Sequence, residues 1–308
     1  MRKLYIAMGF IFILILALVV GGTLILFSDF DFGRGNIAVI NIEGPIVLKS
    51  EDSGLFGHRK MGALDYIDLL DRAEKDSNIK AILLKINSPG GEVIASEKLA
   101  RKVKEVAKKK PVVAYIETIG ASGAYMVACP ADYIIAEKHS IVGSIGVRMD
   151  VLHYYGLMKK LGINVTVIKA GKYKDIASPY RPMTEEEREY LEKMINETYM
   201  DFVIWVAENR NLTINETLKI ANGKIYMGSD AKKVGLVDEV GTEEDAINIT
   251  AKLANITTPK VVEYKGEDFG LFNVLYSLLY SFGYGIGEGL GEVLVKMDYK
   301  PYKTYIMN

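Results

Sequence analysis

The apolar positions of the chain begin with an unbroken run close to the N-terminus. Residues 4–27 form a stretch of 24 residues without a charged side chain, and a helix of that length exceeds the roughly 30 Å hydrocarbon core of a bilayer. A cleaved signal peptide has a shorter apolar region that ends in small residues, whereas this run closes on Leu24, Ile25, Leu26 and Phe27. The pattern predicts an uncleaved membrane-spanning helix.

Charges on either side of this run predict its orientation. Arg2 and Lys3 precede it and Asp29 and Asp31 follow it, so the positive-inside bias leaves the N-terminus in the cytoplasm. The chain is then expected to be a single-pass protein of the cell membrane, with its remaining residues on the extracellular side. Six Asn-x-Thr triplets agree with that location; they begin at Asn164, Asn196, Asn211, Asn215, Asn248 and Asn255.

Beyond residue 35 the spacing of apolar residues alternates between that of strands and that of helices. Strand patterns occupy residues 36–42, 79–86, 112–116, 133–136 and 165–169. Helical patterns occupy residues 63–73, 92–108, 121–129, 151–161, 185–209, 213–221 and 243–253. This alternation predicts an α/β domain with a mostly parallel sheet flanked by helices, whose ligand sites lie at the carboxyl ends of the strands.

The same patterns divide the chain into four parts. We expect an N-terminal anchor at 1–28, a polar and glycine-containing linker at 29–35, one folded domain at 36–265 and an apolar, glycine-rich tail at 266–308. Glu288 and Glu292 interrupt the tail and its glycines weaken a helix. The tail is therefore predicted to make subunit contacts or to lie on the membrane surface rather than to span it.

Composition narrows the chemistry that the domain can perform. The 38 basic and 39 acidic residues leave a net charge of -1, so there is no basic surplus for binding nucleic acid. Cys129 is the single cysteine, and the three histidines lack metal-ligand spacing. We therefore expect neither a metal nor a cofactor, and any hydrolytic mechanism needs a base other than histidine.

Two glycine-rich turns follow predicted strands and could carry such a mechanism. Ser122 lies in Gly120-Ala121-Ser122-Gly123-Ala124, which precedes a helix of small residues. There it could act as a nucleophile, with the Gly123 N–H beside the developing oxyanion. Taken alone, this pattern is more often a serine N-cap. Gly90 and Gly91, after another strand, could complete an oxyanion hole or form a simple turn.

A lysine is the remaining candidate for the base. Lys172 and Lys174 lie in Gly171-Lys172-Tyr173-Lys174-Asp175, just after the strand predicted at 165–169. A lysine accepts the serine proton only as a neutral amine, a form that an apolar pocket favours. Both lysines face the same way in an extended segment, so their spacing does not choose between them.

Four linked motifs make the domain resemble the signal peptide peptidase A family. They are NSPGG at 87–91, GASGAY at 120–125, VGSIGV at 142–147 and GKYKD at 171–175. Their order and spacing match over residues 36–265. The resemblance implies a Clp protease/crotonase-like fold and a Ser-Lys dyad, in an enzyme that degrades signal peptides left in the membrane after cleavage.

The resemblance also implies a role for each matching residue. Ser122 would be the nucleophile and Lys174, rather than Lys172, the general base. Ser144 would orient the lysine amine. The oxyanion hole would be built from the N–H groups of Gly91, Gly123 and Gly90.

The chain carries one copy of the domain, as the short members of the family do. Those members are homo-oligomers whose dyad is completed between neighbouring protomers, so Ser122 and Lys174 could come from different chains. The expected partners are signal peptides and other hydrophobic peptides, the membrane and further copies of the chain.

Three other functions compete with this interpretation. An NfeD-type membrane serine protease, acting on a membrane-associated protein, shares the fold but places its lysine nearer to the serine. A crotonase-type acyl-CoA hydratase or hydrolase would need a cytoplasmic substrate. A non-catalytic scaffold would have no need of Ser122, Ser144 and Lys174.

Overall fold

The computed structural model describes residues 35–50 and 60–266. The predicted membrane-spanning helix and the apolar tail both lie outside the described residues. Within the described ranges, no helix is both long and apolar enough to cross a membrane.

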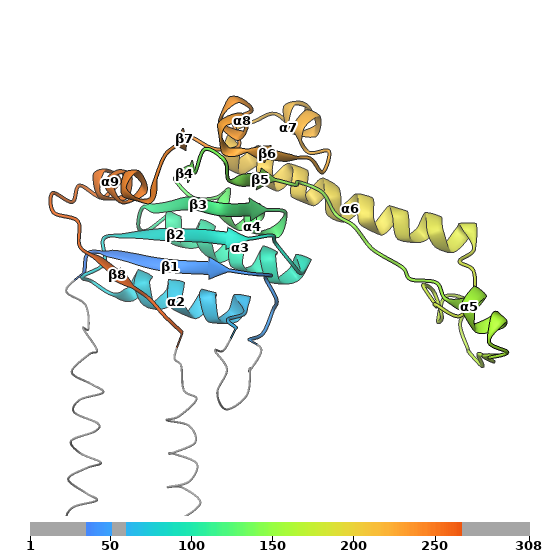
Figure 1. Cartoon of the computed structure of the whole chain (residues 1–308). Helices are drawn as coiled ribbons and strands as arrows, with labels where there is room; N and C mark the ends of the chain where they lie inside the picture. Colours follow the sequence, from blue (N-terminus) through green and yellow to red (C-terminus); the bar gives the residue numbers. More distant parts are fainter. Residues whose placement is uncertain (1–34, 51–59, 267–308) are drawn as a thin grey trace, which may run out of the picture.

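An eight-stranded sheet forms the centre of the domain, with strand order β6-β5-β3-β2-β1-β8, with β4 paired to β3 and with β7 paired to β4. All pairings are parallel except that of β5 with β6. The bounds are β1 Ile37–Glu43, β2 Ala81–Ser88, β3 Val112–Ala121, β4 Tyr133–Ala136, β5 Ile141–Gly143, β6 Ile225–Met227, β7 Glu239–Val240 and β8 Val261–Glu263. The predicted α/β class, with a mostly parallel sheet flanked by helices, is confirmed (Figure 1).

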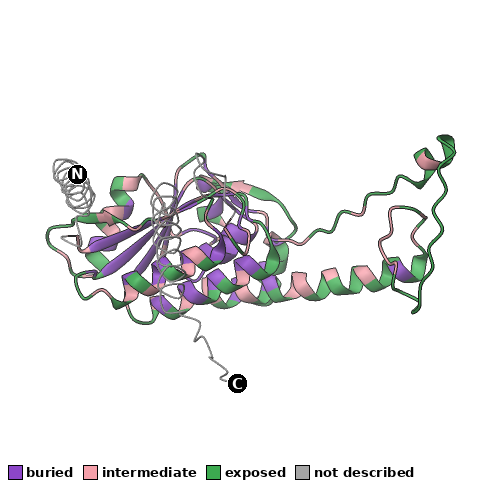
Figure 2. Cartoon of the chain, turned by 90° about the horizontal axis from the view of Figure 1, so that it is seen from below, coloured by how far each residue is buried: buried purple, intermediate pink, exposed green. Residues whose placement is uncertain are grey.

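Helices cover both faces of this sheet. The larger core packs α2 (Ala63–Lys75), α3 (Val93–Ala107) and α4 (Gly123–Ala128) against one face. A smaller core lies under α9 (Glu243–Leu253) on the other. Successive side chains of β1 point to opposite faces of the sheet and so enter both cores. Ile40 and Ile42 lie in the larger core, and Ile37 and Val39 lie in the smaller one. Burial on both faces explains the nearly continuous apolar strands (Figure 2).

A long helix carries the chain away from this body. The helix α6 (Glu185–Arg210) enters the core only with its C-terminal half, through Phe202, Val203 and Val206. Its N-terminal half projects outward together with residues 147–184, which we call the arm (Figures 1 and 2). Two short helices, α7 (Ile214–Ile220) and α8 (Gly228–Lys233), return the chain to the sheet.

Two sequence predictions fail in the arm. The helix expected at 151–161 is only α5, Tyr155–Lys160, and none of its residues is buried. The strand expected at 165–169 does not form, and the backbone of 164–168 makes no hydrogen bond to any described residue. Both patterns are amphipathic, but nothing in the described part of the chain covers their apolar sides. A strand without a paired neighbour gains no ladder hydrogen bonds.

Candidate active site

Three turns meet at one edge of the sheet because three neighbouring strands end there. In the parallel order β5-β3-β2, Ala121 pairs with Gly143 and Gly120 pairs with Ser88. The turns that follow these strands contain Ser144, Ser122 and the Gly90-Gly91 pair. The site predicted at the carboxyl ends of the strands is therefore assembled from segments far apart in sequence.

Ser122 lies in a strained turn between β3 and α4. Its φ of 54° and ψ of -125° are sparsely populated for a residue with a Cβ, at a cost of about 1–3 kcal/mol. Two hydrogen bonds hold the turn: Ser122 N donates to Gly143 O at 2.8 Å, and Met126 N donates to Ser122 O at 3.0 Å. The serine occupies the N-cap position, but its hydroxyl makes no capping hydrogen bond. Helix capping does not explain a serine here.

Gly90 packs directly against this turn. Its φ is +91°, and a Cβ on it would lie 2.6 Å from Gly123 N and 2.9 Å from Ser122 Cβ, so only glycine fits. The Gly90 N–H donates to the buried Ser88 Oγ at 3.1 Å. Of the three predicted oxyanion donors, Gly90 therefore has its N–H engaged within the loop. The motif NSPGG contains Ser88, but sequence reasoning did not assign it this role.

The Gly91 N–H, by contrast, has no hydrogen-bond partner among the described residues. Ile46 N donates to Gly90 O, and Glu92 N donates to Ile46 O, both at 2.9 Å. Since backbone groups alternate in direction along a parallel bridge, Gly91 turns its own N–H away from Ile46. A Cβ on Gly123 would lie 3.3 Å from Gly91 N. The N–H groups of Gly91 and Gly123 are thus close together, and neither has a partner within the described residues.

Ser144 is adjacent to Ser122 through the pairing of β3 and β5. It has a φ of 51°, and its N–H donates to Lys224 O at 2.8 Å. Because Gly143 O accepts from Ser122 N, the residue after Gly143 lies beside the nucleophile candidate. Ser122, Ser144, Gly91 and Gly123 therefore lie close together at this edge of the sheet.

Lys174 lies elsewhere, in an exposed turn at the outer end of the arm. The turn packs on the start of α6, where the rings of Tyr173 and Tyr190 stack with centroids 5.7 Å apart. The carboxylate of Glu186 binds the Lys172 amine and raises its pKa. A raised pKa keeps Lys172 protonated at neutral pH, so its amine is not free to accept a proton.

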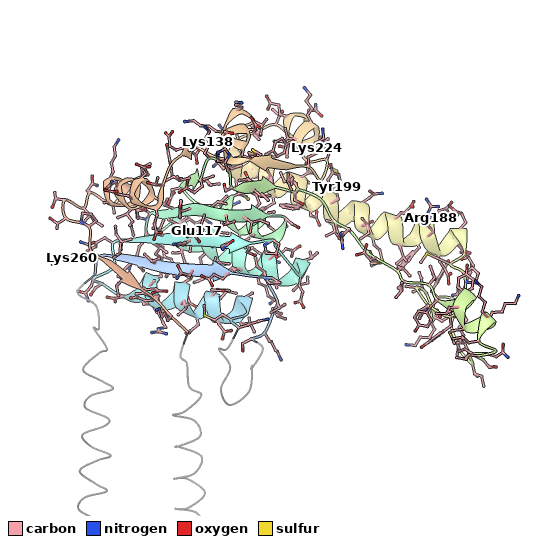
Figure 3. All side chains as sticks on the ribbon, in the orientation of Figure 1. Glu117, Lys138, Arg188, Tyr199, Lys224 and Lys260 are labelled. Carbon is pink, nitrogen blue, oxygen red and sulfur yellow. The ribbon has the colours of Figure 1, made fainter. Side chains whose placement is uncertain are left out.

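The length of α6 separates Lys174 from Ser122 within one chain. Trp205 Nε1 donates to Met126 O at 3.0 Å and so ties α6 to the helix that follows Ser122. From Glu186 to Trp205 the helix advances 19 residues, or about 28 Å. Figure 3 shows Arg188 far out on α6 and Glu117 within the sheet. A single chain does not assemble the predicted dyad.

Arg181 clamps the lysine-bearing turn onto α6. It donates to both carboxylate oxygens of Asp175 at 2.9 Å and to Glu187 at 2.8 Å. These hydrogen bonds lower the pKa of Asp175 far below its usual range and that of Glu187 to about 2. Both carboxylates are therefore charged at neutral pH, and the clamp weakens only as the pH falls toward 2. Sequence reasoning missed Arg181.

Loosening this clamp should impair turnover. Arg181→Gln removes the charged fork that fixes Asp175, the neighbour of Lys174, and we expect kcat to fall roughly tenfold to a hundredfold. Circular dichroism should stay unchanged because the arm projects from the body. Arg188→Gln is the matched control, since its partners Glu185 and Glu192 are exposed and such pairs contribute little. A wild-type kcat for Arg181→Gln would contradict the positioning role.

Ser96, on α3, packs against Gly123 at the start of α4. No motif in the sequence pointed to this residue. Its hydroxyl is buried and has no partner within the described residues. A Cβ on Gly123 would lie only 2.1 Å from Ser96 Oγ and 2.9 Å from Ser96 Cβ. α3 and α4 therefore meet at a point that leaves room only for glycine on α4.

This contact predicts that a substitution at Ser96 restores the activity lost by a substitution at Gly123. Gly123→Ala should push the start of α4 off α3 and lower peptidase activity roughly a hundredfold. Adding Ser96→Gly removes both clashing atoms and should recover most of that loss. Ser96→Gly alone should cost about 1 kcal/mol of stability, since it places glycine in a helix. Peptidase rates of the three variants check this, and a double variant no better than Gly123→Ala would contradict the steric account.

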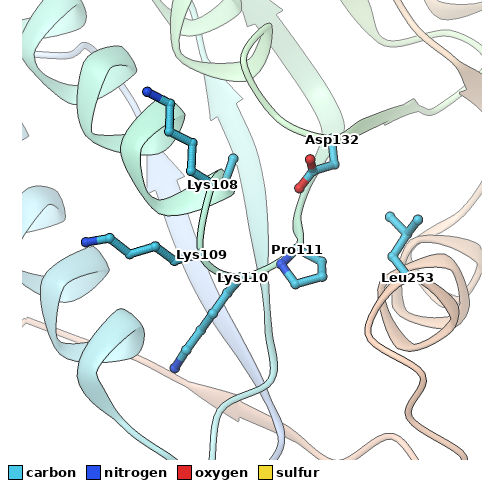
Figure 4. Close-up of a pocket in the computed structure, with 7 residues that line it drawn as sticks. Lys108, Lys109, Lys110, Pro111, Asp132 and Leu253 are labelled. Atoms are coloured by element: carbon cyan, nitrogen blue, oxygen red, sulfur yellow. The ribbon is translucent and has the colours of Figure 1, made fainter.

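The hollow drawn in Figure 4 belongs to the opposite end of the sheet. It is lined by Ala107, Lys108, Lys109, Lys110, Pro111, Asp132 and Leu253. Pro111 directly precedes β3, whose other end carries Ser122. The hollow therefore takes no part in the site.

Comparison with known proteins relates the chain to a family of peptidases. The model of peptidase family S49 matches residues 104–257. A Methanocaldococcus jannaschii protein, named provisionally as a protease, is 62% identical over 90% of this chain and 91% of its own length. An Enterococcus faecium protein, named provisionally as signal peptide peptidase SppA, is 32% identical over 76% of this chain and 68% of its own. A mutant of the 1510-N membrane-bound stomatin-specific protease aligns with a TM-score of 0.48 and 14% identity, over 77% of this chain and 100% of that chain.

Proposed function

The chain belongs to peptidase family S49, and on that premise we propose that it is a membrane-anchored serine endopeptidase that hydrolyses signal peptides and other hydrophobic peptides. The observation that carries this proposal is the Ser122 turn. The Ser122 hydroxyl makes no capping hydrogen bond, and it lies beside two N–H groups that have no partner among the described residues. Family membership sets aside the acyl-CoA hydratase alternative, which needs no nucleophile. It also disfavours the scaffold.

The mechanism that we propose uses four groups. Ser122 Oγ attacks the peptide carbonyl carbon while the neutral Lys174 amine takes the hydroxyl proton. The carbonyl oxygen becomes negative and accepts hydrogen bonds from the N–H groups of Gly91 and Gly123. The lysine ammonium then protonates the leaving amine as the C–N bond breaks. Water, deprotonated by the same lysine, hydrolyses the acyl-enzyme and frees Ser122.

In this proposal Ser122 and Lys174 belong to neighbouring copies. The supporting observation is that the arm carries Lys174 away from its own Ser122 along the continuous helix α6. Ser144, adjacent to Ser122, would then receive and orient the partner's lysine. The fold that this implies, a Clp protease/crotonase-like domain in a ring of short single-copy subunits, is part of the proposal.

The substrate follows from the proposed anchor. A catalytic domain held at the outer face of the membrane by residues 4–27 meets peptides that remain in the bilayer. The test is hydrolysis of a synthetic signal peptide in detergent by the full-length protein. Cleavage by wild type but not by the Ser122→Ala variant supports the proposed function, and cleavage by both contradicts it.

The proposed topology gives a separate expected result. Protease added to intact cells or spheroplasts should digest the chain beyond Phe27 and leave an N-terminal fragment protected. A cytoplasmic protein in the same sample should survive, which shows that the membrane stayed sealed. Complete protection of the domain until the cells are lysed would place it inside and contradict the positive-inside assignment.

A further inference from the structure

The strand β6 is an open edge of the sheet close to the candidate site. Ser144 N donates to Lys224 O at 2.8 Å, and Gly228 N donates to Ser140 O at 2.9 Å. The Lys224 carbonyl and the Gly228 N–H, at the two ends of β6, therefore point toward the side of the sheet where β5 lies. Alternation along an antiparallel ladder then turns the backbone groups of Ile225 and Met227 away from the sheet.

Nothing in the described part of the chain covers this edge. Met227 is the N-cap of α8, so its C=O belongs to that helix, whereas the Met227 N–H and both backbone groups of Ile225 have no partner among the described residues. Their side chains are 59% and 55% exposed, whereas Tyr226 between them turns inward and donates to Ile220 O. An uncharged, apolar edge of this kind is a template for another strand.

The arm contains a segment that has the sequence pattern of a strand but is not part of the sheet. Residues 163–169 are exposed, and the backbone of 164–168 makes no hydrogen bond to a described residue, yet their sequence has the period of a strand. Ile163, Val165 and Val167 share one face and are 45–50% exposed. An apolar strand without a sheet and a sheet edge without a strand are thus present in the same chain.

We propose that residues 163–169 of one copy add as a strand to β6 of a second copy. The proposal rests on the proposed function, because only a second copy needs to bring Lys174 to this Ser122. Main-chain hydrogen bonds to Ile225 and Met227 would supply affinity, and burial of the two apolar faces would fix the register.

The reach of the arm agrees with this pairing. Since β6, β5 and β3 are consecutive neighbours, a strand outside β6 lies three spacings, about 14 Å, from β3. Lys174 follows Lys169 by five residues, which span up to about 17 Å when extended. Another edge strand, β8, lies three strands from β3 on the far side. A strand added to β8 would leave Lys174 too far from Ser122.

Cysteine cross-linking between copies tests the proposal in the full-length protein in mild detergent. Cys129 does not interfere, because it is buried and burial raises its pKa. Val165→Cys and Val167→Cys proteins are each mixed with Ile225→Cys or Met227→Cys protein, allowed to exchange subunits and oxidised. Facing residues on paired strands have Cβ atoms about 5 Å apart, close enough for a disulfide. At least one pairing should give a cross-linked dimer in most chains.

The matched control is Val261→Cys, on the exposed apolar edge strand β8. It should give roughly tenfold less cross-linking with either arm variant. Cross-linking that is equal at the two edges, or absent at β6 because another segment occupies it, would overturn the proposal.

The second measurement introduces charged side chains on the β6 edge. Ile225→Lys combined with Met227→Lys should reduce the assembly to smaller species and lower peptidase activity at least roughly tenfold, with unchanged circular dichroism. A variant that keeps its assembly and its activity overturns the pairing with β6 but leaves the proposed function standing. Activity that survives Ser122→Ala overturns the proposed function instead, so the two failures are distinguishable.

Discussion

Replacing Ser122 with alanine should abolish hydrolysis of a signal peptide while the fold stays intact. The substitution removes one oxygen atom that makes no capping hydrogen bond, and it keeps the Cβ, so the backbone strain is the same in both proteins. Loss of the nucleophile in subtilisin costs about a millionfold in kcat. We expect a loss of at least about a thousandfold here, which leaves room for residual hydrolysis assisted by the two N–H groups.

The measurement is the rate of peptide cleavage together with labelling by a serine-directed active-site probe. The probe should modify the wild-type protein and leave the Ser122→Ala variant unmodified. Ser77→Ala, in an exposed loop after α2, is the control and should keep wild-type activity and labelling. A Ser122→Ala protein with a near wild-type rate would rule out Ser122 as the nucleophile, whatever the geometry of its turn.

The strain at this edge of the sheet is consistent with a functional site. Ser122 and Ser144 both have positive φ values, and the turns that contain them are hydrogen-bonded to each other. Each such residue costs about 1–3 kcal/mol and persists only where surrounding structure enforces it. β3 and β5 provide that enforcement, because their pairing fixes Gly143 O against Ser122 N. Two strained serines in adjoining turns are expected where side chains are held for chemistry.

The central part of the fold was predictable because its pattern is local. Each strand from β1 to β4 is an apolar run between polar or glycine-rich turns, and its position follows from those turns alone. The candidate nucleophile was predictable for the same reason, since Ser122 and its flanking glycines are adjacent in sequence. The meeting of Ser122 with Ser144 depends instead on the pairing of β3 with β5, a strand of only three residues.

What could not be predicted depends on contacts distant in sequence. The hydrogen bond from the Gly90 N–H depends on where the Ser88 hydroxyl points. Position 123 must be glycine because Ser96, on another helix, packs against it. Arg181 gives no signal because an arginine six residues after an aspartate is common. The failed strand at 165–169 has the right sequence pattern, but within one chain its backbone pairs with no described strand. Pattern alone does not say where a strand finds its partner.

Lys174→Met should inactivate the enzyme, whereas Lys172→Met should keep most of its activity. Methionine retains much of the apolar stem of lysine but cannot accept a proton, so the substitution separates chemistry from packing. Lys174 makes no ion pair with a described residue, and we expect at least about a thousandfold loss of turnover. Lys172 is bound to Glu186 on an exposed surface, and losing such a pair costs little. Rates of the two variants under identical conditions check the assignment, and an active Lys174→Met protein would refute it.

Mixing inactive variants then tests whether neighbouring copies share the site. In an equal mixture of Ser122→Ala and Lys174→Met chains, about a quarter of the interfaces pair an intact serine with an intact lysine from the next chain. Activity should therefore recover to about a quarter of the wild-type rate if subunits exchange freely. A dyad within one chain would give no recovery, because every chain lacks one of its two members. Subunit exchange is verified with two differently labelled wild-type preparations, and no recovery under verified exchange would contradict the shared site. Lys174 would then have to reach the Ser122 of its own chain, which the 26-residue helix α6 prevents unless the arm folds back.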